Sequence, residues 1–109
     1  MGNFIITKRK NGSYKFHLTG GYDQPTLTRN GFKTKSSCID GISLVIKNSA
    51  DMNNFERKTA TNRKHYFTLK VPNGHIIGTS EKYYSLAARE NGIYSVKLNA
   101  ANAEIIDNE

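Results

Sequence analysis

The sequence predicts an α+β fold in which a strand-strand-strand-helix unit occurs twice, forming an antiparallel sheet of about six strands with both helices packed on one face. Three observations predict it. The 109-residue chain matches itself when it is shifted by 51 positions. Each half begins with short runs rich in aromatic and β-branched residues, and each ends with apolar residues that recur every three or four positions. We therefore expect a single domain over residues 1–109, with repeats at about 3–51 and 54–102 and a short C-terminal tail.

The repeat rests on ten identities in one register without gaps. They fall at aromatic, turn and helix positions, and the pairs are Phe4/Phe55, Asn11/Asn62, Phe16/Phe67, Leu18/Leu69, Thr28/Thr79, Gly41/Gly92, Ile42/Ile93, Val45/Val96, Asn48/Asn99 and Ala50/Ala101. Phe32 aligns with Tyr83 as a conservative match. Because three strands and one short helix have little core of their own, we expect the two units to share one core.

The first unit opens with a predicted β-hairpin. Residues 4–7 and 14–19 are rich in aromatic and β-branched residues, and Asn11-Gly12 lies between them. The apolar side chains of both runs share parity, and they are Phe4, Ile6, Phe16 and Leu18. A three-residue turn, rather than a strict two-residue turn, places all of them on one face.

The second unit repeats this design, with strands expected at residues 55–59 and 65–71. A Pro-Asn-Gly turn follows, and residues 75–79 predict a third strand, of which residues 26–28 are the weaker counterpart in the first unit. Residues 104–107 fall where a third repeat would begin, and there we expect a short edge strand.

The last segment of each unit predicts an amphipathic helix. In the first unit the recurring residues are Cys38, Ile39, Ile42, Val45, Ile46 and Ser49. The second helix starts from a Ser85 cap, and its apolar face carries Leu86, Ile93, Val96 and Ala100. Gly41 and Gly92 lie inside these helices, where each costs roughly 1 kcal/mol relative to Ala. Close approach of helix to sheet would explain both glycines, and the alternative is a shorter helix capped by Asp40 or Asn91.

Composition limits the class of protein. Residues 1–50 hold eight basic and two acidic residues, which accounts for about +6 of the formal charge of +7. No stretch approaches the roughly 20 apolar residues of a membrane span, and the start of the chain has no apolar signal core. We therefore expect a cytoplasmic protein that does not engage membranes. The single cysteine, Cys38, excludes an intramolecular disulfide and is expected in the core.

Two segments carry a family resemblance: YFTLKVPNGHIIGTSEKY at residues 66–83 and NGIYSVK at residues 91–97. They closely resemble the YegP-like family of small bacterial proteins, and the resemblance covers nearly the whole chain. It implies tandem strand-strand-strand-helix repeats and no established biochemical activity. The first unit departs from the pattern at residues 21–23, which replace the Asn-Gly turn, and at residues 29–32. If the family shares a binding site made of two equivalent halves, this chain keeps only one half.

Basic residues gather at the two hairpin turns and on the sheet face opposite the helices. The candidate anion or nucleic-acid contacts are Lys8, Arg9, Lys10, Lys15, His17, Arg63, Lys64, Tyr66 and Lys70. Cations beside an aromatic ring could attract a phosphate backbone and stack a base. The competing interpretation is a solvated surface, because antiparallel sheets commonly leave one face wet and charged turns are often only solvated.

The connection between the third strand and the second helix is the densest polar-aromatic segment of the chain. Its candidate site residues are Ser80, Glu81, Tyr83, Tyr84 and Ser85. Amides at the start of the helix could hold a carboxylate or phosphate. The competing interpretation is ordinary helix capping, with Tyr83 packed as the partner of Phe32.

No residue pattern predicts catalysis, a metal site or a cofactor. His17, His65 and His75 are too far apart for a local metal motif, and Cys38 has no assignable base. The leading hypothesis is a non-enzymatic binding or interaction module, with a homodimer through a sheet edge or the exposed sheet face as one form. The alternatives are weak nucleic-acid or anion binding through the basic first unit, and an enzyme whose site is assembled between the units.

Overall fold

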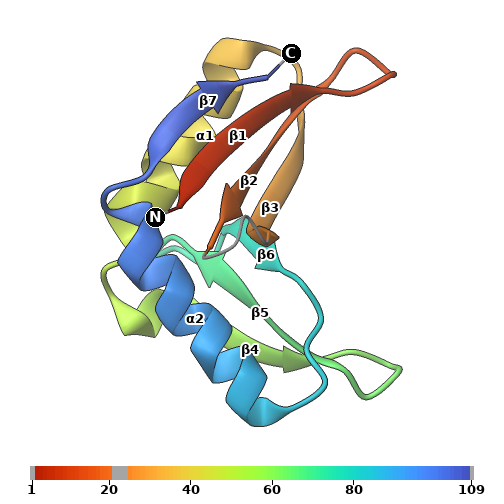
Figure 1. The fold of residues 1–109 in the computed structure, drawn as a ribbon, viewed down its shortest axis with the longest axis vertical. Coiled ribbons are helices and arrows are strands. Elements are labelled where there is room, and N and C mark those ends of the chain that lie inside the picture. The colour runs from red at the N-terminus through yellow and green to blue at the C-terminus, as the bar shows by residue number, and fades with distance from the viewer. Residues whose placement is uncertain (1, 21–24, 109) are drawn as a thin grey trace.

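The computed structural model describes residues 2–20 and 25–108 and contains one seven-stranded sheet and two long helices (Figure 1). The first unit contains β1 (Asn3–Lys8), β2 (Tyr14–Thr19), β3 (Pro25–Phe32) and α1 (Lys35–Asn48). The rest of the chain contains the 3-10 helix η2 (Met52–Asn54), β4 (Phe55–Thr59), β5 (His65–Lys70), β6 (Ile76–Ser80), α2 (Leu86–Ala100) and β7 (Glu104–Asp107). The α+β class and the repeated order of three strands and a helix are confirmed. The altered turn predicted at residues 21–23 lies outside the described residues.

The strands are ordered β4-β5-β6-β3-β2-β1-β7 across the sheet. Each unit supplies three neighbouring strands, and the units join where β3 pairs with β6. Thr28 pairs there with Thr79, which is its own equivalent 51 residues later. A pseudo-twofold axis therefore passes through the middle of the sheet.

The edge strand β7 is the main departure from the expected sheet. It pairs with β1 in parallel, with Ile105 beside Phe4 and Ile106 beside Ile5. The expected antiparallel sheet of about six strands is confirmed only in part. The additional edge strand at 104–107 is present, but its pairing with β1 is parallel, so the sheet is not antiparallel at this edge. The chain leaves α2 near the start of β1 (Figure 1), so a strand that continues from there beside β1 runs in the same direction. The sheet edges, β4 and β7, are the strands through which an edge-paired homodimer would form.

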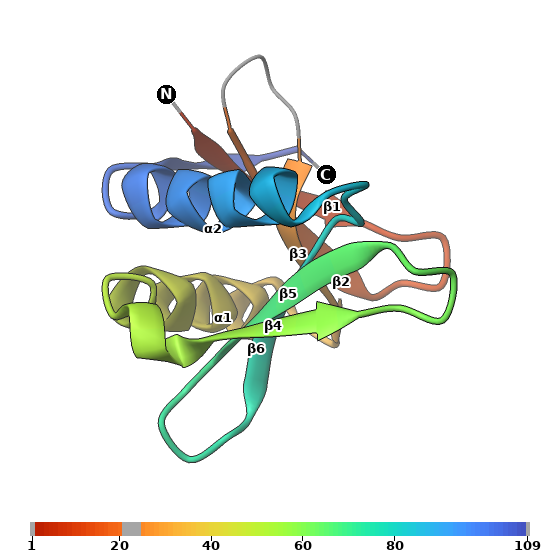
Figure 2. The ribbon, with the colours of Figure 1, turned by 90° about the horizontal axis from the view of Figure 1, so that it is seen from below.

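Both helices lie side by side over the same face of the sheet (Figure 2), and both contact β1, β2, β3 and β5. Thr34 caps α1 and Ser85 caps α2, and each side-chain oxygen accepts a backbone N–H of the first turn at 3.0 Å. The predicted Ser85 cap is confirmed, and the alternative caps at Asp40 and Asn91 are wrong. Within the described ranges, neither helix has the length and apolar character needed to cross a membrane.

The buried stripe of α1 is narrower than the sequence predicts. Cys38, Ile42 and Val45 are fully buried, whereas Ile39 and Ile46 are 38% and 37% exposed. A helix that covers a sheet as a single layer buries only the stripe that faces the sheet, so apolar residues at the flank of that stripe stay partly in water.

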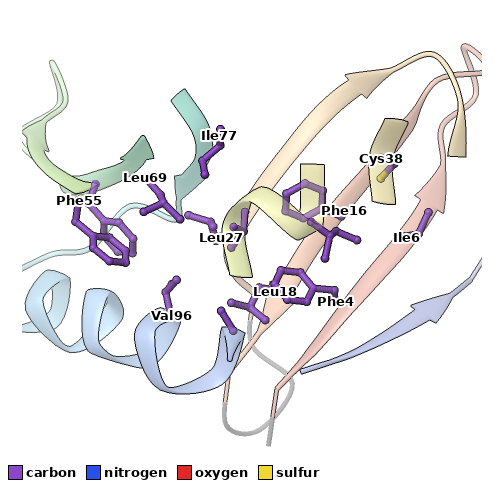
Figure 3. Packing of buried hydrophobic residues seen from close by; sticks show 14 of the residues in the cluster. Phe4, Ile6, Phe16, Leu18, Leu27, Cys38, Phe55, Leu69, Ile77 and Val96 are labelled. Atoms are coloured by element: carbon purple, nitrogen blue, oxygen red, sulfur yellow. The ribbon is translucent and has the colours of Figure 1, made fainter. Parts of the chain in front are cut away.

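Each unit packs three aromatic rings at equivalent positions. In the first unit Phe16 lies 5.9 Å from Phe4 and 5.9 Å from Phe32, measured between ring centroids. In the second unit the set is Phe55, Phe67 and Tyr83, at 5.7 and 6.3 Å. The five phenylalanine rings join side chains from both helices in one buried cluster (Figure 3), and the partly buried Tyr83 packs against it. The expected shared core is therefore confirmed.

The two helix glycines make room for the last ring of each set. A Cβ at Gly41 would lie 2.6 Å from the ring of Phe32, and a Cβ at Gly92 would collide with the Tyr83 hydroxyl. The predicted close approach is therefore correct, and what approaches the helix is an aromatic side chain, which ends β3 in the first unit and follows β6 in the second.

Both hairpin turns hold three residues between their paired ends, as side-chain parity predicts. In the first turn the N–H of Arg9 donates to the carbonyl of Ser13 at 2.7 Å, and the equivalent bond in the second turn measures 2.8 Å. Gly12 has a φ of 86°, and Arg63 takes its place in the second unit with a φ of 65°. The left-handed backbone that suits glycine is therefore held by an arginine in the second unit.

Candidate functional site

The first hairpin turn carries a group that we call the first tip, which consists of Lys8, Arg9, Lys10, Tyr14 and Lys33. Its four cations are exposed, and the Nζ atom of Lys8 lies 5.8 Å from the centre of the Tyr14 ring. Pairing of Tyr14 with Phe32 brings Lys33 to the turn. Among the described residues none of these cations forms an ion pair, so their charge is available to a ligand.

The second hairpin turn carries the corresponding second tip, which consists of Arg63, Lys64, Tyr66, Lys82 and Tyr84. It is assembled by a β-bridge between His65 and Tyr83. The N–H of Tyr83 donates to the His65 carbonyl at 2.7 Å, and the N–H of His65 donates to the Tyr83 carbonyl at 2.8 Å. These two bonds hold the connection between β6 and α2 against the base of the hairpin.

Within the second tip, two lysines lie over two tyrosine rings. The Nζ atom of Lys64 is 4.8 Å from the centre of the Tyr84 ring, and the Nζ atom of Lys82 is 5.1 Å from the centre of the Tyr66 ring. Such contacts are attractive because the ring face is electronegative. The turn cations and the polar-aromatic connection, which the sequence presents as separate candidates, therefore form one surface.

The two tips project from the same side of the molecule, one at each end of the bent sheet (Figure 1). The view from below agrees, because both turns extend beyond the helix layer on that side (Figure 2). The pseudo-twofold relation between the units accounts for this placement. A single elongated ligand could therefore contact both tips.

The sheet face opposite the helices carries the remaining predicted contacts, but most of their charge is compensated. The Nζ atom of Lys70 lies 2.7 Å from Glu56, which also pairs with Lys58 at 3.2 Å. Hydrogen bonds from Lys70 and Lys58 lower the pKa of Glu56. Burial and the charge of Lys15 lower the pKa of His17, so this histidine is neutral at neutral pH. Lys15 is left as the main cation of this face.

Most residues of the predicted connection site have structural roles, and one of them, Tyr84, is exposed to solvent. Ser80 is buried, where its hydroxyl accepts the N–H of Phe67 at 2.9 Å, and Ser85 caps α2. Tyr83 stacks on Phe67 with the ring planes 7° apart. Capping and packing therefore explain these residues, as the competing interpretation predicts, whereas Tyr84 is 85% exposed.

A groove of about 670 Å³ lies between the start of β3 and α2. Its polar lining includes Glu81, Tyr83, Asn91 and Ser95. Burial, together with the negative charge of Glu81, raises the pKa of Tyr83, so the phenol stays protonated. The equivalents of Tyr83 and Ser95 in the first unit are the apolar residues Phe32 and Leu44.

The candidate catalytic side chains do not converge. Cys38 is fully buried, and burial raises the pKa of its thiol to about 11 despite the nearby charge of Arg29. A thiol with this pKa is a poor nucleophile at neutral pH. Across the described ranges, no three His, Cys, Asp or Glu side chains come together in a geometry that could hold a metal ion.

Sequence reasoning missed three members of the tips: Tyr14, Lys33 and Lys82. A signal for one of them, Lys33, was available in the repeat. Lys33 and Tyr84 directly follow the equivalent rings Phe32 and Tyr83. Because each ring residue pairs with the first residue of the second strand of its unit, the residue after it lies beside the hairpin turn. The tyrosine-lysine contacts themselves depend on side-chain geometry that the sequence does not encode locally.

Comparison with known proteins shows that this chain is similar to a family of proteins of unknown function and matches its family model twice. The family described as Domain of unknown function (DUF1508) matches twice, at residues 10–56 and 60–107. A UPF0339 protein in the ptx operon 5' region of Stutzerimonas stutzeri is 39% identical over 106 residues, which cover 97% of this chain and 96% of that protein. UPF0339 protein YegP of Escherichia coli (strain K12) is 38% identical over 107 residues, which cover 98% and 97%.

Two solution NMR structures have the same fold. The YegP protein of unknown function from Escherichia coli superposes with a TM-score of 0.91 at 38% identity, covering 98% of this chain and 92% of that chain. UPF0339 protein SO3888 from Shewanella oneidensis gives a TM-score of 0.90 at 40% identity, covering 97% and 90%. None of these names states an activity or a ligand, so the side chains of this protein must supply the functional argument.

Proposed function

The chain belongs to the DUF1508 family of YegP-like proteins, and from that premise we propose that it is a non-enzymatic binding module whose ligand is nucleic acid, held by the two tips. One observation carries the proposal. Two clusters of exposed cations, each beside a tyrosine ring, project from the same side of the molecule (Figure 1). Phosphate backbones are long, regularly charged ligands that such a pair of clusters fits.

Charge distribution supports this ligand over an acidic peptide or a small anion. The first tip has four cations and no acid among the described residues, while on the outer sheet face Lys58 and Lys70 both pair with the carboxylate of Glu56. Positive charge is therefore concentrated at projecting turns, where a backbone could pass without steric hindrance from the helices. The basic net charge of +7 would also draw nucleic acid to the protein over a distance of about 10 Å at moderate salt.

The buried thiol of Cys38, with its pKa of about 11, supports a binding role rather than nucleophilic catalysis. A cytoplasmic location, as the sequence predicts, would place the protein with both DNA and RNA. The predicted homodimer would double the number of tips without changing the contacts that each tip makes.

Fluorescence anisotropy with labelled oligonucleotides of about 20 nucleotides, longer than most single-domain sites, tests the proposal. We expect binding at low salt that weakens as salt is added. Arg9→Ala combined with Lys10→Ala should weaken binding at low salt at least about tenfold, because two phosphate contacts are lost. The matched control is Lys47→Ala combined with Lys97→Ala, which removes the same charge from the helices and should have little effect.

Two results would overturn the proposal. One is the absence of binding to single-stranded and duplex DNA and RNA even at low salt, where electrostatic contacts are strongest. The other is an equal loss of affinity in the tip variant and in the helix control, which would mean that net charge alone drives association.

A further inference from the structure

Tyr84 is the most exposed large apolar side chain among the described residues. It is 85% exposed, compared with 60% for Leu98 and 58% for Tyr94. A tyrosine normally buries much of its ring because the ring is largely apolar. The ring of Tyr84 therefore contributes little to the core, and its exposure calls for another explanation.

The backbone on both sides of Tyr84 is fixed. Tyr83 before it makes two hydrogen bonds with His65 and stacks on Phe67. Ser85 after it accepts the N–H of Ala88 at 3.0 Å as the cap of α2. Tyr84 is therefore presented from a rigid base, and binding a ligand to its ring would not require ordering of a loop.

Two cations accompany the tyrosines of the second tip. Lys64 lies over Tyr84, and Lys82 lies over Tyr66. Within the described ranges neither lysine forms an ion pair with a carboxylate. Rings that can stack on bases, placed beside cations that can hold phosphates, are the combination used to bind single-stranded nucleic acid.

The first tip lacks this combination at the equivalent positions. Lys33 stands in place of Tyr84, and Lys15 stands in place of Tyr66. The ring that the first tip does have, Tyr14, is partly buried and packs against the core. The first tip therefore offers mainly charge for phosphates, and the second offers both charge and an exposed stacking surface. A fully base-paired duplex hides the faces of its bases and could use only the charge.

We propose that the second tip stacks an unpaired base on Tyr84, so that the preferred ligand is single-stranded nucleic acid. Lys64 holds a phosphate beside the stacked base, and the first tip holds phosphates farther along the strand. This inference deepens the proposed function and rests on it. Stacking does not distinguish ribose from deoxyribose, so the shared chemistry is an unpaired base on a phosphate backbone.

The test measures anisotropy with single-stranded DNA, single-stranded RNA and a DNA duplex of the same sequence. Wild type should bind the single strands several-fold more tightly than the duplex. Tyr84→Ala should weaken single-strand binding about tenfold, as expected for the loss of one stacked base, and leave duplex binding unchanged. Tyr84→Phe keeps the ring and should retain the affinity. Tyr94→Ala, which removes an exposed tyrosine from α2, is the matched control and should have no effect.

The outcomes separate the two proposals. If no oligonucleotide binds, the proposed function fails and this inference fails with it. If duplex and single strands bind equally and Tyr84→Ala changes neither, nucleic-acid binding stands and base stacking is overturned. A single strand of abasic sugar-phosphate adds a further check, because wild type should bind it no more tightly than Tyr84→Ala binds the normal strand.

Discussion

The first unit stacks Phe32 on Phe16, the second stacks Tyr83 on Phe67, and in both units a helix glycine leaves room for the ring. At the residue after the ring the units differ, because the first has Lys33 and the second has Tyr84. The side chain that faces the helix is fixed by packing, and the next one is free to serve a ligand. Equivalent positions in the two units therefore share a role inside the molecule and diverge at the tips.

A second difference lies under the helices. In the first unit Arg29 on β3 places its guanidinium 4.9 Å from the centre of the Phe32 ring, near Cys38 on α1. In the second unit the equivalent strand residue is Ser80 and the equivalent helix residue is Arg89. The second unit therefore carries its arginine on the helix, whereas the first carries it on the strand. The strand residue of the second unit, Ser80, accepts a hydrogen bond from the backbone N–H of Phe67.

Truncating the central ring of either unit tests whether the cores are one. Phe16→Ala and Phe67→Ala each remove a fully buried ring, and each should lower the free energy of unfolding by about 3–5 kcal/mol. Urea unfolding followed by circular dichroism and by tyrosine fluorescence should show one coincident transition for both variants. Two separated transitions would mean that the units fold independently, which would contradict a single shared core.

Adding a methyl group to the helix glycines tests the shared packing. Gly41→Ala and Gly92→Ala should each destabilise the protein by about 1–3 kcal/mol, because the new Cβ overlaps Phe32 or Tyr83 and outweighs the gain in helix propensity. Asp40→Ala and Asn91→Ala change the exposed residue before each glycine and should stay within about 0.5 kcal/mol in the same urea titration. A glycine variant more stable than wild type would contradict this contact.

Exchanging the left-handed turn residue should affect the units in opposite directions. Arg63→Gly should stabilise the protein by up to about 1 kcal/mol, since a non-glycine side chain is strained at a φ of 65°. Gly12→Ala should destabilise it by about 1 kcal/mol, and this cost is purely conformational because nothing lies within 4 Å of the added Cβ. Thermal unfolding of both variants provides the measurement, and shifts of the same sign would be incompatible with equivalent turns.

The ion pair between Arg57 and Glu90 belongs to the second unit only, and Ile6 and Ile39 take the equivalent positions in the first. Hydrogen bonding to Arg57 lowers the pKa of Glu90 below its ordinary value. The pair therefore adds stability above the unfolded pKa, and this contribution is lost as pH falls through the folded pKa. Both side chains are more than a third exposed, so screening limits the contribution to about 0.2–1 kcal/mol.

Glu90→Gln measured by urea unfolding at several pH values checks this sign. The variant should be less stable than wild type at neutral pH, and the difference should disappear at acidic pH, where Glu90 is protonated in both states. A difference that grows on acidification would contradict the assigned cause of the lowered pKa.

Local patterns in the sequence were sufficient for much of the fold. The identities at Phe16/Phe67 and Gly41/Gly92 marked core and close packing, and side-chain parity specified the three-residue turns. The parallel pairing of β7 was not predictable, because it depends on the position of the C-terminal end of α2 relative to β1. The exposure of Ile39 was missed because helical periodicity identifies a face but not the width of the stripe that the sheet covers.

The surface was harder to predict than the core. The sequence separated Lys64 from Tyr84 by 20 residues, and only the bridge between His65 and Tyr83 brings them together. The types of the residues also do not reveal the ion pair between Lys70 and Glu56, because the two residues lie on neighbouring strands and are separated in sequence. Contacts between distant segments therefore decided which of the candidate residues remain available to a ligand.

The central claim is that the first tip contributes charge and the second contributes stacking, and a salt titration of single-strand binding tests it most directly. The plot of log affinity against log salt should lose about 1.4 units of slope in Arg9→Ala combined with Lys10→Ala, or about 0.7 for each lost phosphate contact. Tyr84→Ala should lower the affinity at every salt concentration and leave the slope unchanged. Equal changes of slope in the two variants would contradict the claim.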